Sequence, residues 1–160
     1  MILAVDPGPV RSAYVLWNGE SVQDHDIVEN RQMLTRLTRC FPGPSLLAVE
    51  MIGSYGMPVG RDVFETCVWV GRYLQAWIDD QDPGQDCVLV YRKDVKLELC
   101  GTMRAKDANV RQALLDLVGP RGTKARPGPT YGLRADEWSA LGVAIVAAKR
   151  LQEGKTNGTI

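Results

Sequence analysis

Three carboxylates stand beside apolar segments, where a fold can bring them together around a metal ion. Asp6 and Glu50 each follow an apolar run of four residues, and Asp136 precedes a long apolar stretch. An acid at the end of a buried strand is held rigidly while its oxygens face the open edge of a sheet. Oxygen ligands of this kind suit Mg²⁺, so the pattern predicts metal-dependent chemistry on phosphate.

Each acid also has a structural interpretation. Asp6 precedes Pro7-Gly8, where an aspartate can start a turn by hydrogen-bonding the backbone. Asp136 precedes an expected helix, where it can act as a cap or oppose the helix dipole. Glu50 is harder to explain in this way, because a half-buried carboxylate needs a partner or a metal ion. The three acids together, in this order, favour a shared site.

The charge is balanced overall but unevenly distributed along the chain. The 160 residues include 19 basic and 19 acidic side chains, so no general attraction to nucleic acid follows. Residues 20–90 carry 11 acids and five bases, whereas residues 91–134 carry ten bases and four acids. The second segment is a candidate phosphate-contacting surface, although helices also carry solvated charged faces.

Other function classes find little support. The four cysteines form no C-x-x-C pair, and the lone histidine, His25, is expected to be exposed and without a role, so a zinc site has few ligands. The chain has no apolar stretch of membrane-spanning length and no signal-peptide pattern, so a location in a reducing cytoplasm is expected.

The apolar periodicity predicts an α/β fold with a mixed five-stranded sheet and helices on both faces. A three-stranded meander begins the chain, and Asn18-Gly19 is typical of a two-residue hairpin turn. One domain is expected over residues 1–152, with a flexible tail at 153–160. We expect strands at 2–6, 12–17, 21–27, 46–50 and 87–91, and helices at 31–41, 61–79, 94–99, 105–118 and 136–151.

If the strands of Asp6 and Glu50 are parallel neighbours, their carboxylates share one sheet edge, and the last helix brings Asp136 to it. This arrangement resembles the RNase H-like nucleases. The match narrows to the RuvC-like Holliday junction resolvases. The sequence as a whole looks closest to the resolvases of phages and prophages. The similar stretches are residues 2–8, Arg92 to Lys96, Gly101, residues 104–111 and Asp136-x-x-Ser139-Ala140-Leu141.

The resemblance implies a Mg²⁺-dependent endonuclease, with Mn²⁺ as a possible substitute, that acts as a homodimer on four-way and other branched DNA. Two ions would bridge the scissile phosphate, with Asp6 binding both and Glu50 and Asp136 one each. Lys106 would join these three acids in catalysis by neutralising the phosphate. The DNA-binding residues would be Lys96, Lys106, Arg92, Arg104 and Arg111, together with Tyr55 and Met57 in the loop after Glu50.

The chain departs from the family pattern at one position. The last acid of the family falls at Ser139, and a hydroxyl is a poor Mg²⁺ ligand. Glu137 is a candidate replacement as a metal ligand, although neighbouring helix positions point about 100° apart. Alternatively, Asp136 takes over this work and the site has three carboxylates.

Two rival functions follow from the same residues. A phosphotransferase of the actin and sugar-kinase type also begins with an Asp-x-Gly turn, but it needs a second lobe for which 160 residues leave no room. A non-catalytic branched-DNA-binding module would keep the fold without the acid at Ser139. This module is the main alternative to the nuclease.

Overall fold

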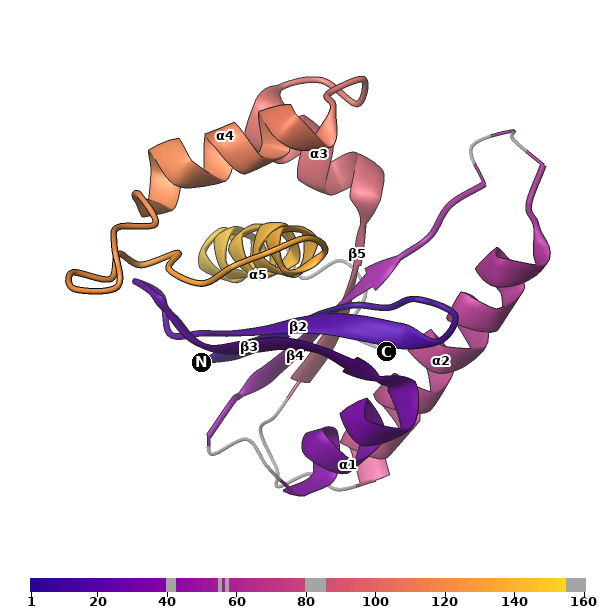
Figure 1. Ribbon diagram of the computed structural model, residues 1–160. Coiled ribbons are helices and arrows are strands. Elements are labelled where there is room, and N and C mark those ends of the chain that lie inside the picture. The colour runs from indigo at the N-terminus through magenta and orange to yellow at the C-terminus, as the bar shows by residue number, and fades with distance from the viewer. Residues whose placement is uncertain (40–42, 55, 57, 80–85, 155–160) are drawn as a thin grey trace.

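A mixed sheet of five strands forms the centre of the computed structural model, which describes residues 1–39, 43–54, 56, 58–79 and 86–154 (Figure 1). The strand order is β3-β2-β1-β4-β5. The strands are β1 (Ile2–Asp6), β2 (Arg11–Trp17), β3 (Val22–Glu29), β4 (Leu46–Met51) and β5 (Asp86–Tyr91). The helices are α1 (Asn30–Arg39), α2 (Arg61–Asp79), α3 (Arg92–Cys100), α4 (Asp107–Val118) and α5 (Glu137–Gln152).

Strand direction divides the sheet in two. The strands β1, β2 and β3 form an antiparallel meander, whereas β4 and β5 run parallel to β1. The expected hairpin is present, but its loop is longer than two residues because the Asn18 side-chain oxygen accepts hydrogen bonds from the amides of Glu20 and Ser21. Gly19 supplies the positive φ, at 105°. The side chain of Asn18 therefore builds the turn itself.

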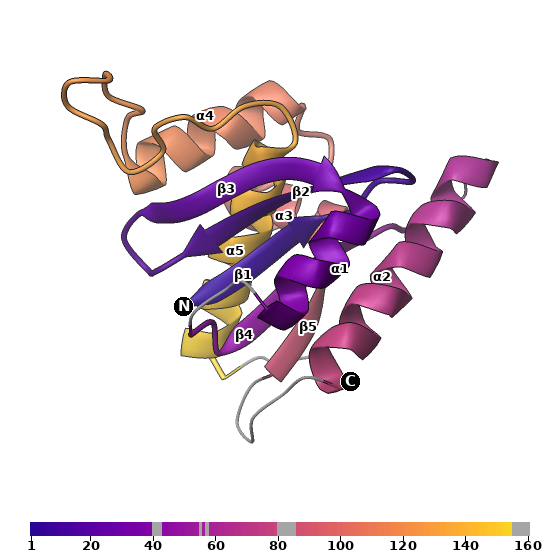
Figure 2. The same cartoon turned by 60° about the horizontal axis from the view of Figure 1, so that its bottom comes forward.

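Helices cover both faces of the sheet, as predicted (Figures 1 and 2). The first two helices, α1 and α2, pack on one face, and α5 lies across the other with α3 and α4 beyond it. Element boundaries differ slightly from those expected: α3 begins two residues earlier, at Arg92, and α4 two residues later, at Asp107. The end of the helix expected at 31–41 lies partly outside the described residues.

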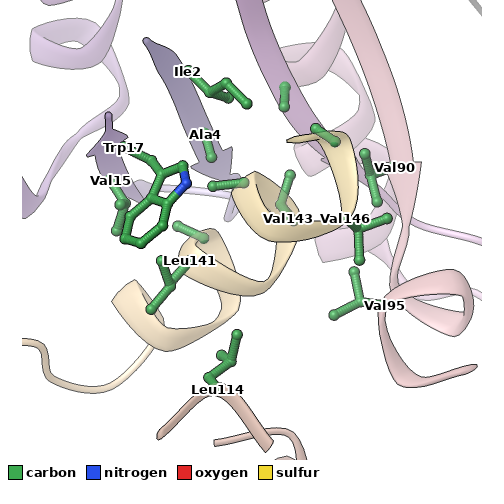
Figure 3. Close-up of a cluster of buried hydrophobic side chains, with 14 of the residues drawn as sticks. Ile2, Ala4, Val15, Trp17, Val90, Val95, Leu114, Leu141, Val143 and Val146 are labelled. Carbon is green, nitrogen blue, oxygen red and sulfur yellow. The ribbon is translucent and has the colours of Figure 1, made fainter. Parts of the chain in front are cut away.

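The helix α5 is the centre of the larger apolar core. Figure 3 shows Leu141, Val143 and Val146 of this helix between sheet residues such as Ala4 and the side chains of Val95 and Leu114 on α3 and α4. The side chains of this cluster are buried. Burial on both sides fixes where α5 begins and therefore where Asp136 and Ser139 lie.

The boundary predicted at residue 152 coincides with the end of α5 at Gln152, but the domain assignment stays a prediction. Residues 155–160, most of the expected tail, lie outside the described residues. In the described part of the chain, no helix combines the length and apolarity needed to cross a membrane.

A glycine allows the close approach of α5 to α3. A Cβ atom added at Gly142 would lie 2.9 Å from Cγ1 of Val95, whereas one added at Gly71, on the exposed side of α2, meets nothing within 4 Å. We therefore expect Gly142→Val to lower the free energy of unfolding by about 1–3 kcal/mol through overpacking. Gly71→Ala should raise it by about 0.5–1 kcal/mol through helix propensity. Urea unfolding of both variants measures the difference, and equal stability of Gly142→Val and wild type would contradict this packing.

Candidate functional site: a buried carboxylate pair at the sheet edge

Parallel pairing of β1 and β4 brings two acids side by side. The register pairs Val5 with Val49, so Asp6 and Glu50 follow as the next residues on neighbouring strands. Both strands are short apolar runs that bury their side chains before the acid is reached. Glu50 is 5% exposed, Asp6 is half-buried, and each carboxyl group shifts the pKa of the other. The expected juxtaposition of Asp6 and Glu50 is thus present in the structure.

The environment disfavours negative charge on both acids. Burial raises the pKa of Asp6 well above its usual range, and the charges of Glu50 and Asp136 raise it further. Burial likewise raises the pKa of Glu50, although the charge of Arg92 and hydrogen bonds from Arg92 and Asp6 oppose that rise. Two carboxylates in one buried place repel each other when both are ionised. The pair therefore needs either a proton or additional positive charge.

Arg92 supplies part of that positive charge. Its Nη1 donates to Oε1 and Oε2 of Glu50 at 3.1 and 3.3 Å and to Oγ of Ser139 at 3.1 Å. Its Nη2 donates to Oδ1 of Asp107 at 2.9 Å. Burial lowers the pKa of Arg92, but Glu50 and Asp107 outweigh this effect and raise it. The guanidinium group thus joins β4, α4 and α5 at the site.

The start of α5 delivers two further groups to this edge. Asp136 is the residue before α5, and its side chain makes no capping hydrogen bond, so the capping interpretation is wrong. Its charge is near enough to raise the pKa of Asp6, and the Ser139 hydroxyl donates to Asp6 and lowers it. Ala135, just before Asp136, has a φ of 41°, the one positive value recorded at a non-glycine residue in the described segments. Such backbone strain is common beside functional sites.

A cavity of about 650 Å³ opens beside these groups. Glu50, Arg92, Asp136 and Ser139 contribute to its wall. The helices α3 and α4 contribute the remaining charged residues of the lining, which are Lys96, Asp107 and Arg111. The cavity therefore joins the carboxylate edge to the basic segment of the chain.

Glu137 does not belong to this group. Its side chain is fully buried, with Oε2 accepting from the amide of Arg134 at 2.7 Å and Oε1 lying 3.1 Å from Nδ1 of His25. Neighbouring positions on a helix point in different directions, so the side chain of Glu137 points away from that of Asp136. Its contact with His25 holds the start of α5 against β3. Its prediction as a metal ligand finds no support in this geometry. The expectation that His25 is exposed and idle was also wrong, because its side chain is 27% exposed and packs against Glu137.

The predicted DNA-contacting residues that the structure describes divide into three groups. Lys96 lines the cavity with its Nζ 3.8 Å from Asp107, and Arg111 stacks on Trp138 at 4.8 Å. Lys106 and Arg104 are exposed just before α4. Arg92, in contrast, points inward to Glu50. The other two predicted contacts, Tyr55 and Met57, lie outside the described residues.

The donor set at the sheet edge fits a hard divalent cation. Asp6 and Glu50 offer only oxygen ligands, and a cation would favour the ionised forms that burial disfavours. In the described segments, however, no three side chains of His, Cys, Asp and Glu already form a group that can hold a metal ion. The site is therefore a buried pair with Asp136 nearby rather than a closed three-carboxylate cage.

Solved structures of known proteins share this fold. Thermus thermophilus RuvC in complex with a Holliday junction substrate has a TM-score of 0.72 and 17% sequence identity, with 96% of each chain covered. A second structure of Thermus thermophilus RuvC has a TM-score of 0.67 and 18% identity, again with 96% of each chain covered. No protein-family model and no curated protein matches the chain. The predicted RNase H-like fold is thereby confirmed, at a level of identity that shows the fold alone.

Sequence reasoning missed the roles of Arg92 and Asp107. Arg92 was expected on the DNA-binding surface, and Asp107 was given no role, yet the two form a 2.9 Å ion pair at the rim of the cavity. The available signal was the position of Arg92 directly after β5, the neighbour of β4. A side chain at that position lies close to whatever follows Val49 on β4.

The buried pair predicts a dependence of stability on pH and metal. Because the pKa of Asp6 is raised in the folded chain, the folded state binds the proton more tightly than the unfolded state. Without divalent ions, stability should therefore fall as pH rises above 3.8, the ordinary carboxyl value, through the raised pKa. We expect Asp6→Asn to raise the melting temperature at pH 7.5 by about 2–4 °C, a gain of roughly 1 kcal/mol, and to weaken the stabilisation by Mg²⁺.

Asp116→Asn is the matched control, because Asp116 is exposed on α4 and accepts a hydrogen bond from Gln112 away from the site. Its melting temperature should follow wild type with and without Mg²⁺. A loss of stability in Asp6→Asn would show that Asp6 is a structural acid and not a strained ligand. Differential scanning calorimetry of the three proteins decides between these outcomes.

Proposed function

We propose that this chain is a divalent-metal-dependent, structure-specific endodeoxyribonuclease that cleaves Holliday junctions and other branched DNA. The observation that carries the proposal is the Asp6–Glu50 pair at the edge of an RNase H-like sheet, beside a cavity that Glu50 and Asp136 line. Such a pair has no evident structural purpose, because burial and mutual repulsion make it costly. The branched substrate bound in the Thermus thermophilus RuvC structure supports this class of DNA.

The reaction is hydrolysis of a phosphodiester bond. Bound Mg²⁺, or Mn²⁺ in its place, would supply an activated water and stabilise the leaving oxygen, and the resemblance implies that two ions take part. Asp6 and Glu50, from neighbouring strands, and Asp136, from the residue before α5, would hold the metal. Lys96 on the wall of the cavity and Lys106 beside α4 would neutralise and position the scissile strand.

The remaining features of the proposal come from the resemblance. A homodimer would place two such sites on a four-way junction, one for each of two strands. The chain would be of the phage or prophage type and would work in the cytoplasm of a bacterial or phage-infected cell. These expectations are independent of the chemistry at the sheet edge and are tested separately, the dimer by sedimentation.

A non-catalytic branched-DNA-binding module is the second candidate, and Ser139 and Arg92 favour it. A hydroxyl stands where the family has an acid, and a guanidinium group already neutralises Glu50 at 3.1 Å. The module would bind junctions through the same basic residues without cutting them. Both candidates therefore predict binding to branched DNA, and only the nuclease predicts its cleavage.

Cleavage of a labelled synthetic four-way junction separates the two candidates. With Mg²⁺, the wild-type chain should produce paired nicks at the branch point, and EDTA should abolish them. Asp6→Asn and Glu50→Gln should lower the rate by at least about 10³-fold while binding in Ca²⁺ stays within a few-fold, because the carboxylates act on the metal and not on DNA. Junction binding without any cutting by wild type, in Mg²⁺ or Mn²⁺, would favour the module. Wild-type rates in Asp6→Asn would refute the site.

The basic residues beside the cavity generate a separate prediction. Lys96→Ala and Lys106→Ala should each weaken junction binding by about three- to tenfold at low salt, with a smaller dependence of the binding constant on salt concentration. Lys149→Ala removes an exposed lysine from the last turn of α5, next to a different cavity, and should have little effect. Electrophoretic mobility shifts over a range of salt concentrations measure the junction-binding constant of each variant and its salt dependence. Unchanged binding in both variants would make the segment an ordinary solvated face.

A further inference from the structure

The guanidinium group of Arg92 occupies the place between Glu50 and residue 139 that a second metal ion would need. One nitrogen, Nη1, lies within hydrogen-bonding distance of both carboxylate oxygens of Glu50 and of the Ser139 hydroxyl. Any ion between Glu50 and residue 139 would have to displace this guanidinium group. The residue it would meet there, Ser139, offers a neutral hydroxyl and no carboxylate.

Arg92 is held mainly by the buried carboxylate of Glu50 and by its place in the chain. Its other terminal nitrogen holds Asp107 at the first turn of α4, and its side chain is 39% exposed. Its backbone begins α3 directly after β5, so the side chain reaches Glu50 from a fixed element. An arginine with this geometry is a permanent positive charge, because its guanidinium group does not lose its proton in proteins.

The formal charge of the site without DNA matches one divalent ion. The three acids Asp6, Glu50 and Asp136 contribute three negative charges when ionised, and Arg92 contributes one positive charge. The exposed Asp107 has Lys96 at 3.8 Å as a further partner and does not change this balance. A single divalent ion therefore neutralises the remaining two negative charges. A second ion would add two positive charges beside the guanidinium group, and like charges at such short range repel each other.

We infer that the site binds one divalent ion, through Asp6 and Glu50 with Asp136, and that Arg92 takes the electrostatic place of a second ion. This inference rests on the proposed function and departs from the two ions that the family resemblance implies. Glu50 retains lone pairs for the ion because Arg92 approaches it through one nitrogen. Arg92 is a charge-balancing and positioning residue, and it serves the site rather than the DNA-binding surface.

The number of bound ions tests the inference directly. Titration of the full chain with Mn²⁺, without DNA, is followed by the electron paramagnetic resonance signal of the free ion. Wild type should bind one Mn²⁺ per chain. Arg92→Gln should bind Mn²⁺ about tenfold more tightly, because a nearby positive charge is removed. The double variant Arg92→Gln/Ser139→Asp adds a carboxylate and removes the guanidinium group beside it, so it should bind two ions.

Two control variants separate charge from folding. Arg92→Lys keeps the charge and should keep one ion with an affinity near wild type, even where Arg92→Gln is unstable. Arg111→Gln removes a positive charge from the same cavity, but Arg111 stacks on Trp138 and does not contact Glu50, so its Mn²⁺ affinity should stay within about twofold of wild type. Equal effects of Arg92→Gln and Arg111→Gln would reduce the role of Arg92 to general electrostatics and overturn the inference.

Cleavage assays run in parallel keep this inference distinct from the proposed function. Two ions bound by a wild-type chain that cleaves junctions would overturn the role of Arg92 and leave the nuclease intact. One bound ion without cleavage would support the ion count and remove the nuclease. A wild-type chain that binds no Mn²⁺ up to millimolar concentrations would contradict both.

Discussion

The cost of placing two carboxylates in one buried position governs this structure. Asp6 and Glu50 follow apolar strand residues that are buried, so the sheet holds a half-buried and a buried carboxylate side by side. The pKa of each is raised by burial, which means that their ionised forms are destabilised in the folded chain. Several neighbouring side chains partly offset this destabilisation.

The surrounding elements bring positive charge and hydrogen bonds to the pair. Arg92 begins α3 directly after β5, the strand next to β4. Ser139 lies in the first turn of α5, where its hydroxyl accepts from Arg92 and, through a hydrogen bond, lowers the pKa of Asp6. The helix α5 can lie there because Gly142 allows it to approach Val95 of α3 closely. The apolar core and the polar edge are thus two consequences of the same helix position. A guanidinium group and a hydroxyl still leave net negative charge, which is what a divalent cation would neutralise.

The fold could largely be predicted because its signals are local. Short apolar runs ending in Asp6 and Glu50 mark buried strands, and helical periodicity marks α2 and α5, so strand order and layers follow from ordinary connection rules. The juxtaposition of Asp6 and Glu50 required only that β1 and β4 be parallel neighbours. The Asn18-Gly19 hairpin was predicted with a shorter loop, because the side chain of Asn18 captures two amides that a two-residue turn would leave free.

The parts of the site that escaped prediction depend on tertiary contacts. The inward direction of Arg92 follows from how α3, α4 and α5 meet, which no local pattern encodes. Glu137 was a candidate ligand by its place in the chain, yet helix geometry turns it toward His25 and away from the cavity. A one-residue shift on a helix therefore separates a structural acid, Glu137, from a functional candidate, Asp136.

The account depends most directly on a cation binding at the Asp6–Glu50 pair. Crystals of the full chain grown with Mn²⁺, with data collected near the manganese absorption edge, would locate bound ions by their anomalous signal. We predict one anomalous peak, in contact with the carboxylate oxygens of both Asp6 and Glu50. An ion bound elsewhere, with these two carboxylates unligated, would contradict the account.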